Sequence, residues 1–179
     1  MILVHGYFSN RGTLCRLAEA LDAAGAGPVT VPSLPAVLAP IETFASHLER
    51  VVREVTQASG QERAILVCHS MGGLVARTYL RTHGAGRIAG IVTLGSPHHG
   101  SALAALGAGE NGRQMRPGSD FLRRLEEGES AAMAGLSFLS VFTAHDNLVA
   151  PQESSRLAWA RNLRLAGVGE VPVADERQD

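Results

Sequence analysis

The chain has 179 residues, 45% of them hydrophobic, which is enough to build the buried core of one domain. Its 16 Lys and Arg nearly balance its 17 Asp and Glu, and the formal net charge of −1 argues against a nucleic-acid partner. No apolar run reaches the roughly 18 residues of a transmembrane segment, and the start MILVHGYF has no basic signal-peptide region. We therefore expect one domain over residues 1–179, cytoplasmic and monomeric.

Strand and helix patterns alternate along the chain, which is typical of a mostly parallel sheet with helices on both faces. The predicted fold class is therefore α/β. In chain order the elements are a strand at 2–5, a helix over 14–21, strands at 29–31 and 64–68 around a helix over 41–55, a helix over 74–82, strands at 88–94 and 136–143, a helix over 156–160 and a strand at 163–165.

Three local features refine this prediction. Charged residues that include Glu49 and Arg50 oppose the apolar stripe of the 41–55 helix and are expected to face solvent. Cys15 and Cys68 are too few for a disulfide framework and are expected to be buried free thiols. Residues 100–135 are the least regular segment, with GAGENG (107–112) typical of a loop and FLRRL typical of a short amphipathic turn, so this segment is a candidate small cap.

Ser70 lies in the stretch LVCHSMGGLV, between a predicted strand and a predicted helix. A nucleophile elbow requires such a junction, because the sharp turn exposes the serine hydroxyl and small neighbours relieve backbone crowding. The usual pattern is GxSxG, whereas this chain has CHSMG, with Cys68 in place of the first glycine. The alternative is a helix N-cap serine, but the double glycine and the following helical run favour the nucleophile.

The motifs VHGY, CHSMGG, VTLGSPHHGS, HDNLVAP and GVG, in this order, make the chain similar to the small bacterial lipases and esterases of the α/β-hydrolase fold. The resemblance spans residue 2 to about residue 169. It implies a minimal α/β-hydrolase fold and hydrolysis of carboxylic esters by a Ser, Asp and His triad. Related lipases are often secreted.

Residue by residue, the resemblance implies that Ser70 is the nucleophile and that the backbone N–H groups of Tyr7 and Met71 form the oxyanion hole. Asp146, 76 residues beyond the serine, agrees with the Ser, Asp, His chain order of this fold. A carboxylate in that place can alternatively be a turn former or a helix cap.

The expected general base is absent. The family places its histidine after a GVG turn, and here Glu170 occupies that position. The family continues into a closing helix after this turn, and we expect none of that kind within residues 171–179. Three explanations stay open: a homologue with impaired hydrolysis, a base relocated to His98 or His99 in SPHHG, or Glu170 acting itself, although an ordinary carboxylate is a weak base for an alcohol.

No cofactor and no metal site are predicted, because the adjacent His98 and His99 have no evident third ligand. The expected partner is a small ester or lipid substrate. Thioesterase, amidase and acyltransferase activities are open on the same fold and serine. The alternative of a different class is a catalytically impaired homologue that binds an acyl or aromatic ligand in the same pocket.

Overall fold

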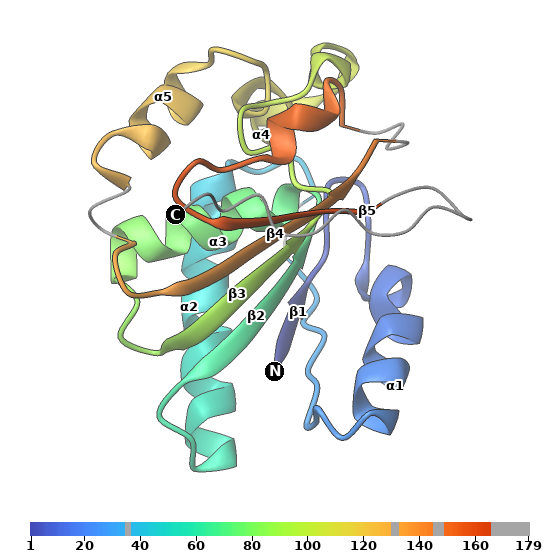
Figure 1. Cartoon of the computed structure of the whole chain (residues 1–179), viewed down its shortest axis with the longest axis vertical. Coiled ribbons are helices and arrows are strands. Elements are labelled where there is room, and N and C mark those ends of the chain that lie inside the picture. The colour runs from blue at the N-terminus through green and yellow to red at the C-terminus, as the bar shows by residue number, and fades with distance from the viewer. Residues whose placement is uncertain (35–36, 130–132, 145–148, 166–179) are drawn as a thin grey trace.

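The computed structural model describes residues 1–34, 37–129, 133–144 and 149–165. Five strands form one sheet in the order β1-β2-β3-β4-β5, and all four strand pairs are parallel (Figure 1). Each strand therefore lies beside its neighbour in the chain. The strands are β1 Ile2–Val4, β2 Ala64–His69, β3 Ile88–Leu94, β4 Ser137–Thr143 and β5 Arg161–Leu165.

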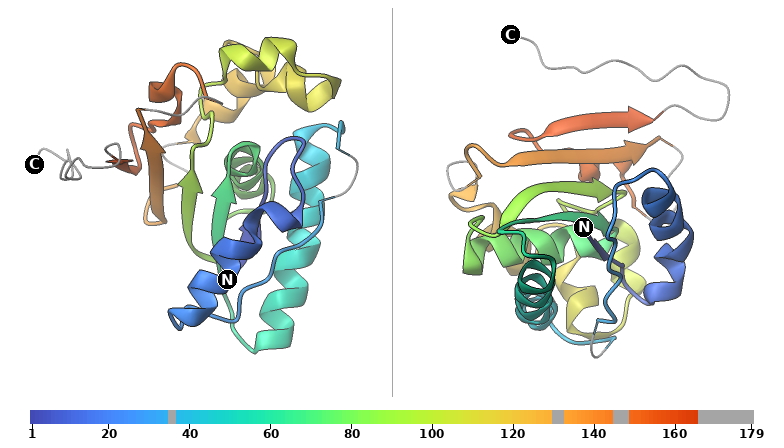
Figure 2. Two further views of the ribbon diagram at one scale, coloured as in Figure 1. Left: turned by 90° about the vertical axis from the view of Figure 1, so that its right-hand side faces the viewer. Right: turned by 90° about the horizontal axis from the view of Figure 1, so that it is seen from below.

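Helices cover both faces of this sheet (Figures 1 and 2). The α-helices are α1 Cys15–Ala23, α2 Ile41–Ser59, α3 Met71–His83, α4 Gly109–Gln114 and α5 Asp120–Glu126. Three 3-10 turns complete the list, η1 Arg11–Leu14, η2 Ala102–Leu106 and η3 Gln152–Ser155. The prediction of a mostly parallel sheet with helices on both faces is confirmed.

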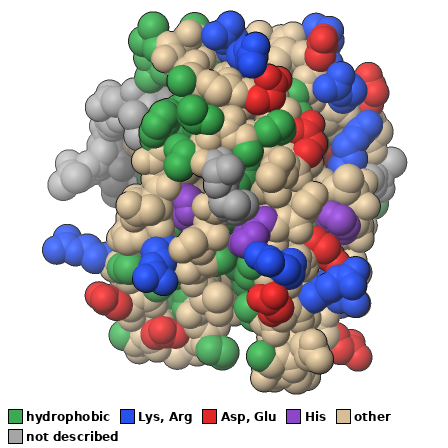
Figure 3. Space-filling model, turned by 180° about the vertical axis from the view of Figure 1, so that it is seen from behind, with side chains coloured by type: hydrophobic (Ala, Val, Ile, Leu, Met, Phe, Trp, Pro, Cys, Tyr) green, Lys and Arg blue, Asp and Glu red, His purple; other side chains and the backbone are tan. Residues whose placement is uncertain are grey.

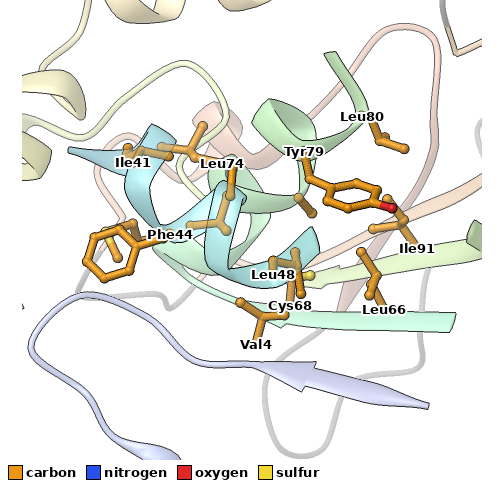
Figure 4. Packing of buried hydrophobic residues seen from close by; sticks show 14 of the residues in the cluster. Val4, Ile41, Phe44, Leu48, Leu66, Cys68, Leu74, Tyr79, Leu80 and Ile91 are labelled. Carbon is orange, nitrogen blue, oxygen red and sulfur yellow. The ribbon is translucent and has the colours of Figure 1, made fainter. Parts of the chain in front are cut away.

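The main core lies between the sheet and the α2–α3 pair (Figure 4). Helix α2 contributes the side chains that the 3.6-residue period predicted, among them Phe44 and Leu48, and these pack toward Leu74 of α3 and Leu66 of β2. A smaller cluster on the opposite face joins Leu14 and the partly buried Leu17 and Leu21 to Leu3 and Val67 of the sheet. Helix α1 packs against the sheet through this second cluster.

The predicted strand at 29–31 is not a strand of the sheet. Only one bridge, Ile2 with Thr30, continues the pairing beyond β1, through hydrogen bonds from the Leu3 amide to the Thr30 carbonyl and from the Thr30 amide to the Met1 carbonyl. Pro28 immediately before this short run lacks an N–H, so it cannot donate to the strand ladder.

The predicted helix at 156–160 is also wrong. The helical turn is η3, which ends at Ser155, and the chain then bends into β5. The Asn162 side chain accepts a hydrogen bond from the Leu157 amide and donates to the carbonyls of Leu157 and Ala160. Local bonds of this kind compete with the helical i to i−4 pattern.

Three finer expectations are corrected as well. GAGENG is not a loop throughout, since α4 begins at Gly109 and the buried Asn111 donates to the Val37 carbonyl from it. Glu49 is buried rather than solvated, with its carboxylate on Arg53 one helical turn away. Cys15 is exposed, whereas Cys68 is buried as expected. Within the described part of the chain, we find no helix that could span a bilayer.

Candidate active site

Ser70 is the single residue between β2 and α3, and its backbone has φ 53° and ψ −125°. A non-glycine residue with positive φ is strained, and such strain persists where the surrounding structure fixes it, often at functional sites. The Ser70 hydroxyl makes no capping hydrogen bond to α3. The helix-cap alternative therefore has no support, and the half-buried side chain is presented at the end of the strand.

Crowding around this turn accounts for the glycines on both sides of it. A methyl group at Gly72 would lie 2.6 Å from the Val4 carbonyl oxygen, and one at Gly73 would lie 2.7 Å from the Ser96 Cβ. Both distances are too short for real side chains. The start of α3 can pack this closely on β1 and on the turn after β3 only with glycine at these two positions.

The turn after β1 lies directly against Ser70. A methyl group at Gly6 would lie 2.8 Å from the Ser70 Cβ and 3.2 Å from its Oγ. The next residue is Tyr7, and Met71 follows the serine. Among the described residues, neither the Tyr7 amide nor the Met71 amide has a hydrogen-bond acceptor. Two free N–H donors thus lie on the two turns that meet at Ser70.

Side chains hold the turn after β1 in place. His5 is buried, with Nδ1 3.2 Å from the Gly6 carbonyl oxygen and Nε2 accepting from the Leu34 amide at 3.4 Å. The Tyr7 phenol donates to the Ala108 carbonyl at 2.5 Å. The ring of Tyr7 therefore connects this turn to the segment before α4, and its hydroxyl is not directed at Ser70.

Cys68, which replaces the first glycine of the usual serine motif, faces the main core. Complete burial raises the pKa of its thiol. The thiol therefore stays protonated at neutral pH and offers no competing nucleophile.

Asp146 and Glu170 lie outside the described residues. The elements that lead to them are described: β4 ends at Thr143, and β5 ends at Leu165. In the register of the sheet, His69 is paired with Leu94, and Leu94 with Val141. The carboxyl ends of β2 and β4 therefore reach the same edge of the sheet, which is the edge where Ser70 lies.

His98 is fully buried, and its ring lies against the start of α3. Its Nε2 is 3.1 Å from the Thr93 hydroxyl, which donates to Ser140, and the Ser140 hydroxyl donates to the Ser155 carbonyl. Burial, and next the nearby Arg77 guanidinium, lower the pKa of His98 well below its ordinary value. The ring is thus a neutral member of a buried polar chain, and no hydrogen bond joins it to Ser70.

His99 lies at the surface, with both ring nitrogens occupied. Nδ1 is 2.8 Å from Glu126 Oε1 on α5, and Nε2 is 2.8 Å from the Arg156 carbonyl oxygen. The structure therefore does not bring either histidine of SPHHG into hydrogen-bond contact with the serine. Within the described residues, no group of three His, Cys, Asp or Glu side chains is placed to hold a metal ion.

A buried ion pair that the sequence did not suggest fixes the turn holding these histidines. Arg77, two turns along α3 from Ser70, is fully buried and binds both carboxylate oxygens of Glu129, at 2.6 and 2.5 Å. It also donates to the His98 carbonyl at 2.7 Å. The signal available in the sequence was an arginine within the apolar run LVARTYL, on the side of the helix that faces the core.

Elements η2, α4 and α5 follow this turn and lie at the top of the molecule in Figure 1, and we refer to these three elements as the cap. Figure 3 shows hydrophobic side chains gathered at this end of the back face. Around the cap and the turn after β1, five large apolar side chains are exposed. We call them the apolar rim: Phe8, Val37, Leu38, Leu103 and Leu106.

Comparison with known proteins agrees with this geometry. Residues 1–176 match the alpha/beta hydrolase family. The chain belongs to this family.

Solved structures show the same fold at low identity. The mature form of the Bacillus licheniformis lipase BlEst2 aligns with a TM-score of 0.79 at 18% identity, over 92% of this chain and 82% of that one. Aspergillus fumigatus lipase B aligns with a TM-score of 0.81 at 19% identity, over 92% of this chain and 44% of that one. The chain thus spans less than half of the length of the fungal lipase and most of the length of the bacterial one. The resemblance to lipases and esterases of this fold is confirmed.

The lowered pKa of His98 predicts how the stability of this protein depends on pH. The unfolded chain binds a proton at His98 near pH 6.5, whereas the folded chain does not, so protonation favours unfolding. The free energy of unfolding is therefore fully maintained above about pH 6.5 and falls below it, by at most about 1.4 kcal/mol per pH unit from this group. Urea unfolding of the wild type and His98→Gln between about pH 5 and 7 measures the difference. Equal slopes in the two proteins would contradict the assignment.

Proposed function

We propose that this protein hydrolyses carboxylic esters, with Ser70 as the nucleophile. The observation that carries the proposal is the strained serine between β2 and α3, with the Gly6 turn packed directly against it. Ser70 Oγ attacks the ester carbonyl carbon, and the carbonyl oxygen becomes an oxyanion that accepts from the Tyr7 and Met71 amides. The bond from the carbonyl carbon to the alkoxy oxygen then breaks, and the alcohol leaves with the proton that the serine hydroxyl has lost. Water hydrolyses the acyl-serine ester, which releases the carboxylic acid and restores the serine hydroxyl.

The oxyanion hole accounts for part of the expected rate. Each backbone donor placed at the developing charge contributes roughly 3 kcal/mol to lowering the barrier. Met71 is the first residue of α3, where the helix dipole also favours negative charge. Asp146 is proposed as the acid of the triad because β4 delivers the chain to the same sheet edge as Ser70.

The proposed site has no histidine at the position of the general base. Glu170 stands where the resemblance places histidine, and the rings of His98 and His99 are engaged elsewhere. We therefore propose an esterase with an impaired proton acceptor. In a serine hydrolase, loss of the triad histidine costs on the order of 10⁶ in turnover, so we expect slow hydrolysis by the wild type.

Glu170→His is expected to raise the turnover of a short-chain nitrophenyl ester by at least about ten-fold, because an imidazole accepts the serine proton near neutral pH. Glu170→Gln is the matched control and should leave the slow wild-type rate unchanged. No gain from histidine, together with a large loss from glutamine, would instead identify Glu170 as the working base. Initial rates at equal enzyme concentration measure both variants.

The apolar rim supports acyl esters as the substrate class. Phe8 follows Tyr7 in the turn after β1. The Glu110 amide donates to the Leu38 carbonyl at 3.2 Å, which places Leu38 beside α4. Leu103 and Leu106 belong to η2. These side chains lie on the turn after β1 and on the segments beside α4 and η2, and we propose that they offer an apolar surface to a hydrocarbon chain.

Leu106→Ser is expected to reduce hydrolysis of long-chain nitrophenyl esters a few-fold, while short-chain esters are hydrolysed at the wild-type rate. Leu106 is 87% exposed, so the change removes apolar surface without opening the core. Ala58→Ser, on the exposed end of α2, is the control. An equal loss for both chain lengths would show that the rim does not contact the acyl chain.

The alternative function, binding of an acyl or aromatic ligand without turnover, is favoured by the same absence of a histidine at position 170. Covalent labelling by a fluorophosphonate separates the two functions. An activated serine forms a stoichiometric adduct, whereas a serine in a pure binding site does not react.

A further inference from the structure

In the described part of the chain, two residues other than glycine have a positive φ, Ser70 at 53° and Phe8 at 49°. They belong to the two turns that meet at the candidate site, where Gly6 of one turn packs against Ser70 of the other. A strained backbone of this kind persists only where the surrounding structure holds it. The Phe8 side chain is 65% exposed, so burial of its own ring does not hold the turn after β1.

Backbone hydrogen bonds do not hold this strained turn either. Among the described residues, neither Tyr7 nor Phe8 takes part in a backbone–backbone hydrogen bond. The Tyr7 phenol instead donates to the Ala108 carbonyl at 2.5 Å, 101 positions further along the chain. The ring of Tyr7 also packs against the main core. The side chain is therefore fixed along its length, and the amide of the same residue is fixed with it.

The Ala108 carbonyl belongs to the stretch GAGENG, whose small residues let the chain close around the phenol. A methyl group at Gly107 would lie 3.3 Å from the Tyr7 hydroxyl oxygen, and one at Gly112 would lie 3.0 Å from the Gly107 carbonyl carbon. Both distances are shorter than ordinary van der Waals contact, so larger side chains would push this stretch away from the phenol. We call residues 107–112 the phenol socket.

The phenol socket is itself anchored to the segment that leads into α2. The Asn111 side chain donates to the Val37 carbonyl at 2.8 Å. Just after the socket, the Gln114 side chain accepts a hydrogen bond from the Ile41 amide at 2.7 Å, at the start of α2. The phenol bond therefore ties the turn after β1 to a part of the cap that is held in place, not to a free loop.

We propose that the Tyr7 side chain is a positioning residue, which holds the amide of Tyr7 at the oxyanion position beside Ser70 through its bond to the phenol socket. The phenol touches no reacting atom and acts only through its own backbone. This role rests on the proposed function, whereas the seating of the phenol does not. A change in the phenol socket should therefore reach the oxyanion through Tyr7.

Hydrogen exchange tests the seating of the phenol without reference to activity. Tyr7→Phe removes only the hydroxyl, and the hydrogen-bonded Gly107 and Glu110 amides report on the socket. Both amides should exchange about three- to ten-fold faster in Tyr7→Phe, the size expected for the loss of one hydrogen bond. Thr56→Val is the matched control, because it removes a hydroxyl that donates to the Val52 carbonyl at 2.8 Å on α2, and it should leave both amides unchanged. Equal exchange in Tyr7→Phe and the wild type would overturn the proposal.

The kinetics of nitrophenyl ester hydrolysis test the positioning role. In Tyr7→Phe, kcat should fall about three- to ten-fold while KM stays within about two-fold, because an oxyanion donor acts in the transition state. A general loosening of the cap would instead raise KM. Thr56→Val should keep both constants of the wild type. An unchanged kcat in Tyr7→Phe, or a rise in KM alone, would overturn the positioning role.

A second variant changes the same bond from the side of the socket. Gly112→Ala crowds the Gly107 carbonyl and should lower kcat a few-fold in the wild type, but should cost nothing further in Tyr7→Phe, where no phenol bond remains. Losses that multiply in the double variant would overturn the coupling. If the wild type neither hydrolyses the ester nor is labelled at Ser70 by a fluorophosphonate, the proposed function and the positioning role both fail. The exchange measurement then still decides whether the phenol is seated.

Discussion

Replacing Ser70 by alanine is expected to remove the slow ester hydrolysis that depends on this serine and, in Glu170→His, the whole gain that the histidine gives. The hydroxyl is the proposed nucleophile. Without it, the oxyanion hole can still bind the carbonyl oxygen, but no group of the protein attacks the carbonyl carbon. Initial rates on nitrophenyl esters at high enzyme concentration measure the loss. Unchanged hydrolysis in Ser70→Ala would end the proposal that this serine forms the acyl intermediate.

The same position provides its own control for folding. Alanine keeps the Cβ and removes a hydroxyl that makes no capping bond, so the free energy of unfolding should stay within about 0.5 kcal/mol of the wild type. Ser70→Gly should unfold at a higher urea concentration, because glycine adopts φ 53° without the strain, a gain of about 1 kcal/mol. If both variants are stable but inactive, the loss of activity comes from the missing hydroxyl and not from unfolding.

Breaking the buried pair of Arg77 and Glu129 is expected to cause the largest loss of stability. Arg77 is fully buried and Glu129 nearly so, and removal of one partner leaves the other charge without a counter-ion in the core. Such losses amount to about 3–5 kcal/mol, a large share of the 5–15 kcal/mol that stabilises a typical domain. Urea unfolding of Arg77→Met and of Glu129→Leu measures the cost.

The double variant Arg77→Met with Glu129→Leu is the control for this interpretation. With both charges gone, no ion remains to be desolvated, so the double variant should lose less than the sum of the two single losses. The His98 carbonyl loses its donor in either variant that removes Arg77, which leaves a residual cost. Two small and additive losses would show that the pair contributes little.

The fold could be predicted from the sequence because its signals are local. Strand runs such as residues 64–68, the apolar period of α2 and the glycines after Ser70 each specify their element from residues that are close together in the chain. The elements that were wrong, at 29–31 and 156–160, are short, and contacts from other parts of the chain decide them. Asn162, for example, turns the chain where the pattern alone favoured a helix.

The surroundings of the candidate site could be predicted less completely. The partners of Arg77 and His99 lie 52 and 27 residues further along the chain, and no spacing rule connects them. The sequence therefore left His98 and His99 open as bases. In the structure, the His98 ring belongs to a buried polar chain, and the His99 ring contacts Glu126 on α5. Asp146 and Glu170 lie outside the described residues, so their roles stay predictions.

The most direct test of Ser70 as an activated nucleophile is covalent labelling of the intact protein with a fluorophosphonate, read by mass spectrometry and peptide mapping. The account predicts one adduct per chain, on Ser70, formed slowly in the wild type and absent from Ser70→Ala. Absence of an adduct in the folded wild type after prolonged incubation, or an adduct on another residue, would contradict it.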